Sequence, residues 1–223
     1  MDKKLFLIPA VPSSGTSALA GVLHHLGVYM GTLDSEKAHE KRGYDMFEDM
    51  DTWKFASTLN AGEKLSEGKL SRSSFRLRAY INHRLIYDPP GPSGAKIPAV
   101  FCVYDPEPKD LDIITLNVQR QFETCLASDR SIMIKAGKYD DIMDDWIKVA
   151  SFNRLRAGDL GACVAGKMEI FQHHEPVVNV TFDELIANKE EVVPSMVETL
   201  GLEPTDEQVK EAIDFLDKDK KHL

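Results

Sequence analysis

The pattern of hydrophobic positions predicts that the chain begins with a strand, a turn and a helix. Residues 5–11 form a short, nearly continuous apolar run, which is typical of a strand buried on both faces of a parallel sheet. Residues 16–26 carry apolar side chains at helical spacing, and Gly27 is suited to end that helix. The polar residues 12–15 between them predict a tight turn.

The same order of strand and helix returns in the second half of the chain. Apolar runs there predict buried strands, and amphipathic stretches follow them. The expected strands are residues 112–118 and 177–181, and the expected helices are residues 121–128, 139–155, 183–200 and 205–216, the last with a capping box of Thr205 and Gln208. This alternation predicts a three-layer α/β domain with a central, mainly parallel sheet flanked by helices.

Prolines refine these boundaries at two places. Residues 88–94 hold three prolines and two glycines, which predicts a loop that divides the chain into halves. Pro194 falls inside an otherwise helical window, so we expect a kink there or a new helix that begins near Val193.

The composition is that of an ordinary soluble globular protein. The 223 residues carry 27 Lys and Arg against 36 Asp and Glu, a net charge of −9, and 43% of them are hydrophobic. A negative chain is a poor general binder of nucleic acid or anionic membrane, because both partners reward a basic surface. No apolar stretch approaches the length that spans a bilayer. We therefore expect one domain over residues 1–223, with neither nucleic acid nor membrane as a partner.

The charge is unevenly distributed. Residues 54–84 hold 7 basic and 2 acidic residues, whereas residues 176–223 hold 5 basic and 12 acidic ones. The first segment is a candidate basic helical cap, whose field would attract a polyanionic ligand.

The cysteines and the N-terminus indicate a cytoplasmic location. Cys102, Cys125 and Cys163 are odd in number and show no Cys-x-x-Cys spacing, which favours a reducing compartment. The N-terminus imitates a short signal peptide, but Pro9 and the polar residues 12–17 interrupt the apolar segment that a signal peptide needs.

The turn after the first strand has the chemistry of a phosphate-binding loop. Residues 12–17 read Pro-Ser-Ser-Gly-Thr-Ser, so backbone amides and hydroxyls gather at a helix N-terminus, where phosphate is favoured. No lysine follows Gly15, so the nucleotide-kinase loop Gly-x-x-x-x-Gly-Lys-Ser/Thr is absent. On these six residues alone, a helix that is merely capped after a turn is an equal alternative.

Several segments together resemble the sulfotransferase family, in particular its microbial members. The loop is similar to the family's phosphosulfate-binding loop, Pro-Lys/Arg-Ser-Gly-Thr-Ser/Thr, and Arg120 and Ser128 match its pair of Arg and Ser eight residues apart. In the family this pair holds one phosphate. One continuous helix would place the two residues about two turns apart, which is too far for one phosphate, so we expect Arg120 to lie in the loop that leads into the helix. Further similar segments are residues 43–49, the Lys-x-Pro segment 94–98 that precedes a strand in relatives, and residues 180–202.

The resemblance implies a P-loop-like α/β fold that binds 3′-phosphoadenosine 5′-phosphosulfate (PAPS) and transfers its sulfuryl group to a hydroxyl or amine of a small-molecule acceptor, without a metal. It implies that Arg120 and Ser128 hold the 3′-phosphate, and that Phe182, which replaces a tyrosine of relatives, stacks on the adenine. The residues that it assigns to the 5′-phosphosulfate are Ser13, Ser14, Gly15, Thr16 and Ser17.

One residue departs from the family pattern at a place that matters for catalysis. Ser13 stands where most relatives place Lys or Arg, and a neutral hydroxyl cannot replace that charge. Loss of one such donor commonly costs on the order of hundredfold in rate. Lys96 is the candidate replacement, with a solvated lysine as an equal alternative, and Glu48 is the candidate general base from its place in residues 43–49.

Two other functions stay open. One alternative is a nucleotide-binding protein of this fold that has lost catalysis because Ser13 stands in place of Lys or Arg. A kinase of related fold is less favoured, because the loop lysine is missing. No motif specifies the acceptor.

Overall fold

The computed structural model describes residues 4–11, 13–31, 80–98, 113–121, 123–125, 127–128, 164 and 167–219. The helix expected at residues 139–155 lies outside this part of the chain, as does all of the candidate basic cap except residues 80–84. In the described part, no helix is both long and apolar enough to cross a membrane.

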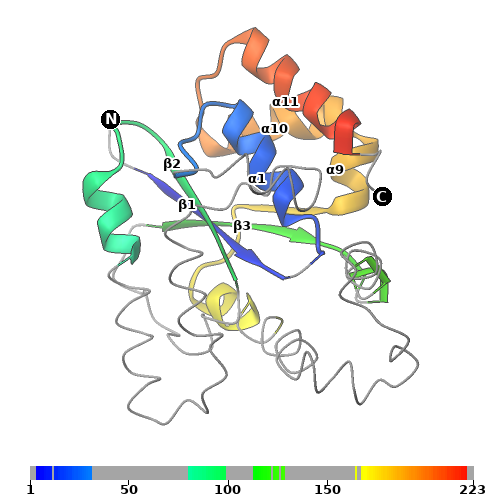
Figure 1. Cartoon of the computed structure of the whole chain (residues 1–223), viewed down its shortest axis with the longest axis horizontal. Coiled ribbons are helices and arrows are strands. Elements are labelled where there is room, and N and C mark those ends of the chain that lie inside the picture. The colour runs from blue at the N-terminus through cyan, green and yellow to red at the C-terminus, as the bar shows by residue number, and fades with distance from the viewer. Residues whose placement is uncertain are drawn as a thin grey trace, which may run out of the picture.

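Within the described residues, a parallel sheet of four strands forms the central layer (Figure 1). Its strands are β1 (Leu5–Ala10), β2 (Ser93–Pro98), β3 (Ile113–Gln119) and β4 (Val178–Thr181), in the order β2-β1-β3-β4. All three pairings between neighbours are parallel, so the expected α/β class and its mainly parallel sheet are confirmed.

Helices cover both faces of this sheet. All six residues of β1 are buried, and alternate side chains along a strand point to opposite faces. Phe6 and Ile8 enter a core with the helices of one face, whereas Leu5 and Leu7 enter a second core with Ile81 and Ile170. The helices of the first face are α1 (Thr16–His25), α9 (Phe182–Ala187), α10 (Lys189–Leu200) and α11 (Asp206–Asp219). The second face carries helical residues 80–87 and 167–173.

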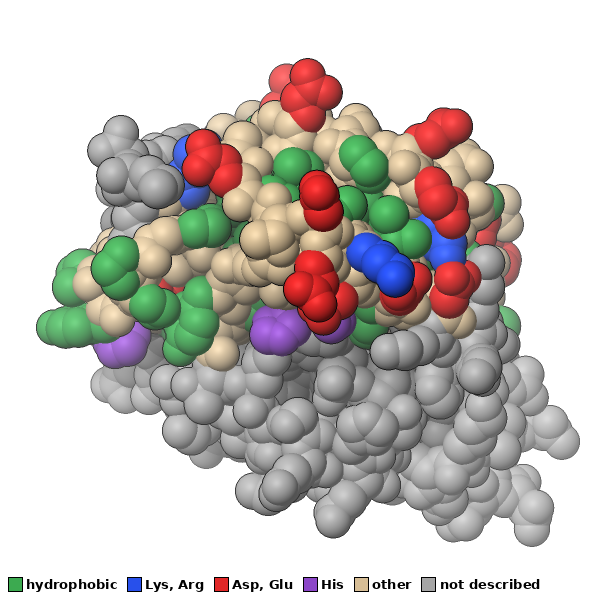
Figure 2. Space-filling model, turned by 90° about the horizontal axis from the view of Figure 1, so that it is seen from above, with side chains coloured by type: hydrophobic (Ala, Val, Ile, Leu, Met, Phe, Trp, Pro, Cys, Tyr) green, Lys and Arg blue, Asp and Glu red, His purple; other side chains and the backbone are tan. Residues whose placement is uncertain are grey.

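The acidic character of the C-terminal segment is visible on the outer surface. Figure 2 looks onto the side of the molecule that carries α10 and α11, where Asp and Glu side chains are more frequent than Lys and Arg among the described residues. The negative charge therefore lies on the outward faces of these helices.

Local signals in the sequence define several helix ends. Gly27, with φ of 88°, follows the end of α1, where Val28 N–H donates to the Leu23 carbonyl at 2.9 Å. Thr205 and Gln208 form the expected capping box before α11. A second box, which the sequence analysis missed, joins Thr181 and Glu184 at the start of α9.

Two predicted boundaries are wrong. Residues 88–94 are not all loop, because β2 already begins at Ser93, and the Lys-x-Pro segment 94–98 lies within this strand. Gly94 has a packing role in it, since a Cβ there would lie 2.5 Å from the Met30 sulfur. The helical window 183–200 breaks at Asn188, between α9 and α10, rather than near Val193. Pro194 lies inside α10.

Candidate active site

The residues expected to bind the anion lie at the carboxyl ends of the strands. Residues 13–17 follow β1, Arg120 follows β3, Phe182 follows β4, and Lys96 lies near the end of β2. The chain passes from β1 to β2 on one side and then to β3 on the other, so the strand order changes direction between β1 and β3. In open α/β sheets, ligands bind in the crevice outside such a switch point.

The loop between β1 and α1 is held by its own hydrogen bonds. Ser14 donates from its backbone N–H and from its Oγ to the Val11 carbonyl, at 3.2 and 2.7 Å. Its hydroxyl therefore serves the loop rather than a ligand. Ser13 and Gly15 both have positive φ, 57° and 89°, a conformation that is uncommon for a serine.

The N-terminus of α1 is suited to an anion. Gly15 is its N-cap residue, so the N-cap offers no side chain, and the first turn holds no acidic residue. The first N–H groups of a helix have no partner within the helix, and they carry partial positive charge. The loop therefore directs backbone donors toward the space beyond the sheet edge.

Phe182 and Arg120 pack against this loop. A Cβ on Gly15 would lie 2.3 Å from Cδ2 of Phe182, so only glycine allows the ring to approach the loop so closely. The Arg120 guanidinium carbon lies 4.7 Å from the centre of the same ring, within the range of a cation–π contact. Phe182 is 5% exposed. Its contacts support Arg120 and the loop, and its stacking on adenine stays a prediction.

Arg120 presents hydrogen-bond donors at the switch point. Its Nη1 donates to the Ser13 carbonyl at 3.3 Å, and its buried Nε has no hydrogen-bond partner within the described residues. A guanidinium carries five N–H donors in a fixed fork, which suits the oxygens of a phosphate. Arg120 lies between the end of β3 and helical residues 123–125, which confirms its predicted place in the loop.

Lys96 brings a second cation to the loop from the other side. Position 96 on β2 pairs with Ile8 on β1. The Lys96 ammonium donates to Ser17 Oγ at 2.8 Å, across 79 positions of sequence, and the residue is 4% exposed. The pairing of β1 with β2 thus places this lysine at the first turn of α1.

Other expected site residues are not joined to this group. Ser128 lies in helical residues 127–128 and is half-buried, and among the described residues no hydrogen bond connects it with Arg120 or the loop. Thr16 is buried. Glu48 lies outside the described residues.

Sequence reasoning missed Lys167, which also lies at this edge of the sheet. Its ammonium donates to the Val118 carbonyl at 2.8 Å, near the end of β3. Burial lowers the pKa of Lys167 to about 8. A short amphipathic run at residues 167–173 was the one available signal, and it carries no motif.

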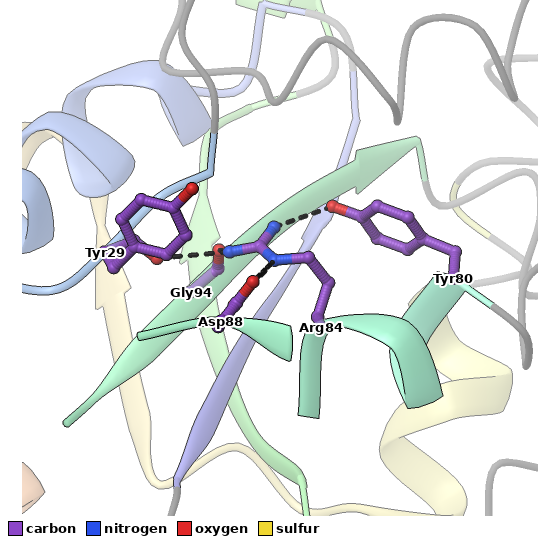
Figure 3. Close-up of polar contacts among 5 residues, drawn as sticks. All are labelled: Tyr29, Tyr80, Arg84, Asp88 and Gly94. Atoms are coloured by element: carbon purple, nitrogen blue, oxygen red, sulfur yellow. Dashed lines mark hydrogen bonds and ion pairs between the residues drawn. The ribbon is translucent and has the colours of Figure 1, made fainter. Parts of the chain in front are cut away.

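Arg84, the last residue of the candidate basic cap, lies at the opposite edge. Its guanidinium donates to the carbonyls of Tyr29 and Gly94, at the amino end of β2, as Figure 3 shows. Arg84 therefore holds the fold together and does not add charge to the loop.

Comparisons of the chain with known proteins assign neither a family nor a function to it. No protein-family model matches the chain, and no curated protein matches it. The chemistry of the site is therefore argued from its own residues.

Proposed function

We propose that the protein is a PAPS-dependent sulfotransferase of P-loop-like fold that sulfates a hydroxyl or amine of a small-molecule acceptor in the cytoplasm. The observation that carries this proposal is the position of Arg120. It contacts the loop at the Ser13 carbonyl and keeps a buried Nε without a partner among the described residues. A loop, a helix N-terminus and a guanidinium that meet at a switch point fit an anionic nucleotide.

The donors divide naturally between two anionic groups. The α1 amides and the Ser17 hydroxyl would hold the 5′-phosphosulfate, and Arg120 with Ser128 would hold the 3′-phosphate. Lys96 supports the first assignment, because its contact with Ser17 brings a cation to the first turn of α1, and Ser13 adds no charge to the loop. A cation there can stabilise charge that develops on the leaving phosphate.

In the proposed transfer reaction, different residues of the chain would have different roles. PAPS supplies the sulfuryl group when bound. Lys96 neutralises charge on the leaving oxygen, the α1 amides orient the equatorial oxygens, and Glu48 is the candidate base that takes the acceptor proton. In this scheme no step needs a nucleophilic side chain of the protein.

Calorimetric titration with 3′-phosphoadenosine 5′-phosphate tests the binding part of the proposal. The wild type should bind at least about tenfold more tightly than Arg120→Ala and Lys96→Met, because each variant loses a charge-assisted hydrogen bond. Lys210→Met removes an exposed lysine on α11 and is the matched control. Equal affinity in the wild type and Arg120→Ala would overturn the site assignment.

A second function, binding without transfer, is favoured by Ser13. Its side chain adds no positive charge to the loop. Tight binding of the nucleotide with no sulfation across a panel of alcohols and amines would support this alternative. Sulfation that increases in Ser13→Arg would show that the missing cation limits catalysis.

A further inference from the structure

β1 and β3 stop pairing before they reach the loop. Their pairing runs from Leu5 with Ile113 to Leu7 with Thr115, whereas β3 stays paired with β4 as far as Gln119. The hydrogen-bonded pairing of the two strands therefore ends before the switch point beside residues 13–17, and we call this unpaired part the separation between β1 and β3.

The Val118 carbonyl points into this separation. The Thr115 carbonyl accepts a hydrogen bond from the Val177 N–H on the β4 side. Carbonyls alternate in direction along a strand, so the carbonyl of Val118, three residues on, is directed toward β1. At that position β1 no longer supplies a backbone donor.

The Lys167 ammonium takes the place of that donor. It lies 2.8 Å from the Val118 carbonyl oxygen. Lys167 lies in helical residues 167–173, whose Ile170 packs in the core on the face opposite α1. The side chain thus reaches the separation between β1 and β3 from the other side of the sheet.

This ammonium has donors left over, and no carboxylate of the described residues forms an ion pair with it. Val118 O is its one hydrogen-bond acceptor within the described residues, although an ammonium has three donors. Burial makes the charged form costly, as the lowered pKa of about 8 shows. A half-buried cation that has no counterion among the described residues is stabilised when an anion binds next to it.

We propose that Lys167 is a ligand-binding residue of the same site, whose ammonium contacts the phosphate or sulfate oxygens of the bound anion from the β3 side. This inference rests on the proposed function for the identity of the nucleotide, but not for the presence of an anion. With Lys96 on the β2 side and Lys167 on the β3 side, two cations flank a loop whose own cation is replaced by Ser13.

The charged groups around Lys167 define the controls. Cys125, in helical residues 123–125, interacts electrostatically with Lys167, and its Sγ lies 3.9 Å from the Arg120 carbonyl oxygen. Arg120, which follows β3, carries a further charge at this edge of the sheet. β1 contributes no titratable side chain. Cys125→Ser therefore separates titration of the thiol from titration of the amine.

The test is calorimetric titration of the full chain at pH 8 with inorganic pyrophosphate and with 3′-phosphoadenosine 5′-phosphate, in buffers of different ionisation enthalpy. Binding of an anion raises the pKa of Lys167, so the wild type and Cys125→Ser should take up a fraction of a proton per anion bound. Lys167→Met should bind at least about tenfold more weakly. Lys167→Arg, which keeps a donor for the Val118 carbonyl, should bind without this proton uptake, because arginine stays charged.

The outcomes separate this inference from the proposed function. Unchanged affinity and proton uptake in Lys167→Met and Lys167→Arg would overturn the role of Lys167 and leave the nucleotide site standing. Lys167-dependent binding of pyrophosphate without binding of the nucleotide would support the role of Lys167 and overturn the sulfotransferase. No binding of either probe by the wild type would overturn both.

Discussion

Arg84 and Asp88 form a buried ion pair one helical turn apart, with the Arg84 Nε 2.7 Å from Oδ2 of Asp88 and side chains only 4% and 6% exposed. Arg84 also donates to the Tyr80 hydroxyl, at 2.8 Å. The two tyrosine rings of Figure 3, Tyr29 and Tyr80, lie 5.5 and 5.8 Å from the guanidinium carbon. This cluster ties helical residues 80–87 to the amino end of β2, away from the candidate active site.

We expect Arg84→Met to lower the free energy of unfolding by about 3–5 kcal/mol, because it leaves the Asp88 carboxylate buried without its partner. Urea unfolding of the variant measures this loss. Arg84→Lys should restore little, because an ammonium cannot satisfy the Tyr80 hydroxyl, two carbonyls and Asp88 with the geometry of a fork.

The double variant Arg84→Met with Asp88→Leu is the control, since it removes both charges and should be less destabilised than Arg84→Met alone. Nucleotide affinity of the folded fraction should not change in any of these variants, because the cluster lies at the other edge of the sheet. A selective loss of affinity would contradict that separation.

Gly15→Ala should be among the most destabilising substitutions in the loop. The new Cβ would lie 2.3 Å from Phe182, at a φ of 89°. We expect a loss of about 2–4 kcal/mol in the free energy of unfolding, from strain at positive φ and from overpacking. Gly91→Ala is the matched control, because Gly91 also has positive φ, 119°, but no atom within 4 Å of the added Cβ.

The difference between the two alanine variants measures the contact with Phe182. Phe182→Leu should relieve part of the penalty of Gly15→Ala, because the aromatic ring that meets the Cβ is gone. Equal losses of unfolding free energy in Gly15→Ala and Gly91→Ala would mean that the loop shifts away from the Phe182 ring. The contact between the loop and the ring would then not position Arg120.

The capping box of α9 predicts a pH effect on stability. The backbone N–H and the hydroxyl of Thr181 hydrogen-bond to Glu184 and lower the pKa of its carboxyl. A carboxylate with a lowered pKa binds fewer protons in the folded state, so its contribution is complete above the unfolded pKa of about 4.3 and is lost as the pH falls through the folded value. Below both values the contribution is absent.

Glu184→Gln isolates this charge, because glutamine keeps an acceptor for Thr181. In thermal unfolding, the wild type should have a higher melting temperature than Glu184→Gln near pH 6, and this difference should shrink toward pH 3. A difference in stability that stays constant over this pH range would mean that the shape of the Glu184 side chain, and not its charge, stabilises the wild type.

The sequence predicted the fold better than the site. β1, α1 and β3 could be predicted because each is a short run with one dominant hydrophobic pattern. The place of Arg120 could be predicted because the resemblance assigns it and Ser128 to one phosphate, which two residues eight positions apart on one continuous helix could not share. β2 was missed because Ser93 and Gly94 are poor strand formers, and their N–H groups bond to the carbonyls of Lys4 and Tyr29, which lie far away in sequence. Lys167 was missed because the role that we propose for it depends on the separation of two strands far from it in sequence. Such a contact has no local signal.

The last prediction concerns the stability of the ligand-free protein at alkaline pH. Because burial lowers the pKa of Lys167 to about 8, the unfolded chain holds one more proton than the folded chain between about pH 8 and the ordinary lysine pKa near 10.5. Stability rises with pH wherever the unfolded state binds more protons, so this residue should add stability over that interval, on the order of 3 kcal/mol in total.

Other groups also titrate between pH 8 and 10.5, so the quantity to measure is the difference in the free energy of unfolding between the wild type and Lys167→Met. It should shift in favour of the wild type as the pH rises from 8 to 10.5, with Lys210→Met as a control that shows no such shift. Saturating pyrophosphate should move the rise to higher pH, because an anion beside the ammonium opposes its deprotonation. A difference that is independent of pH without the anion would mean that Lys167 is solvated and has its ordinary pKa.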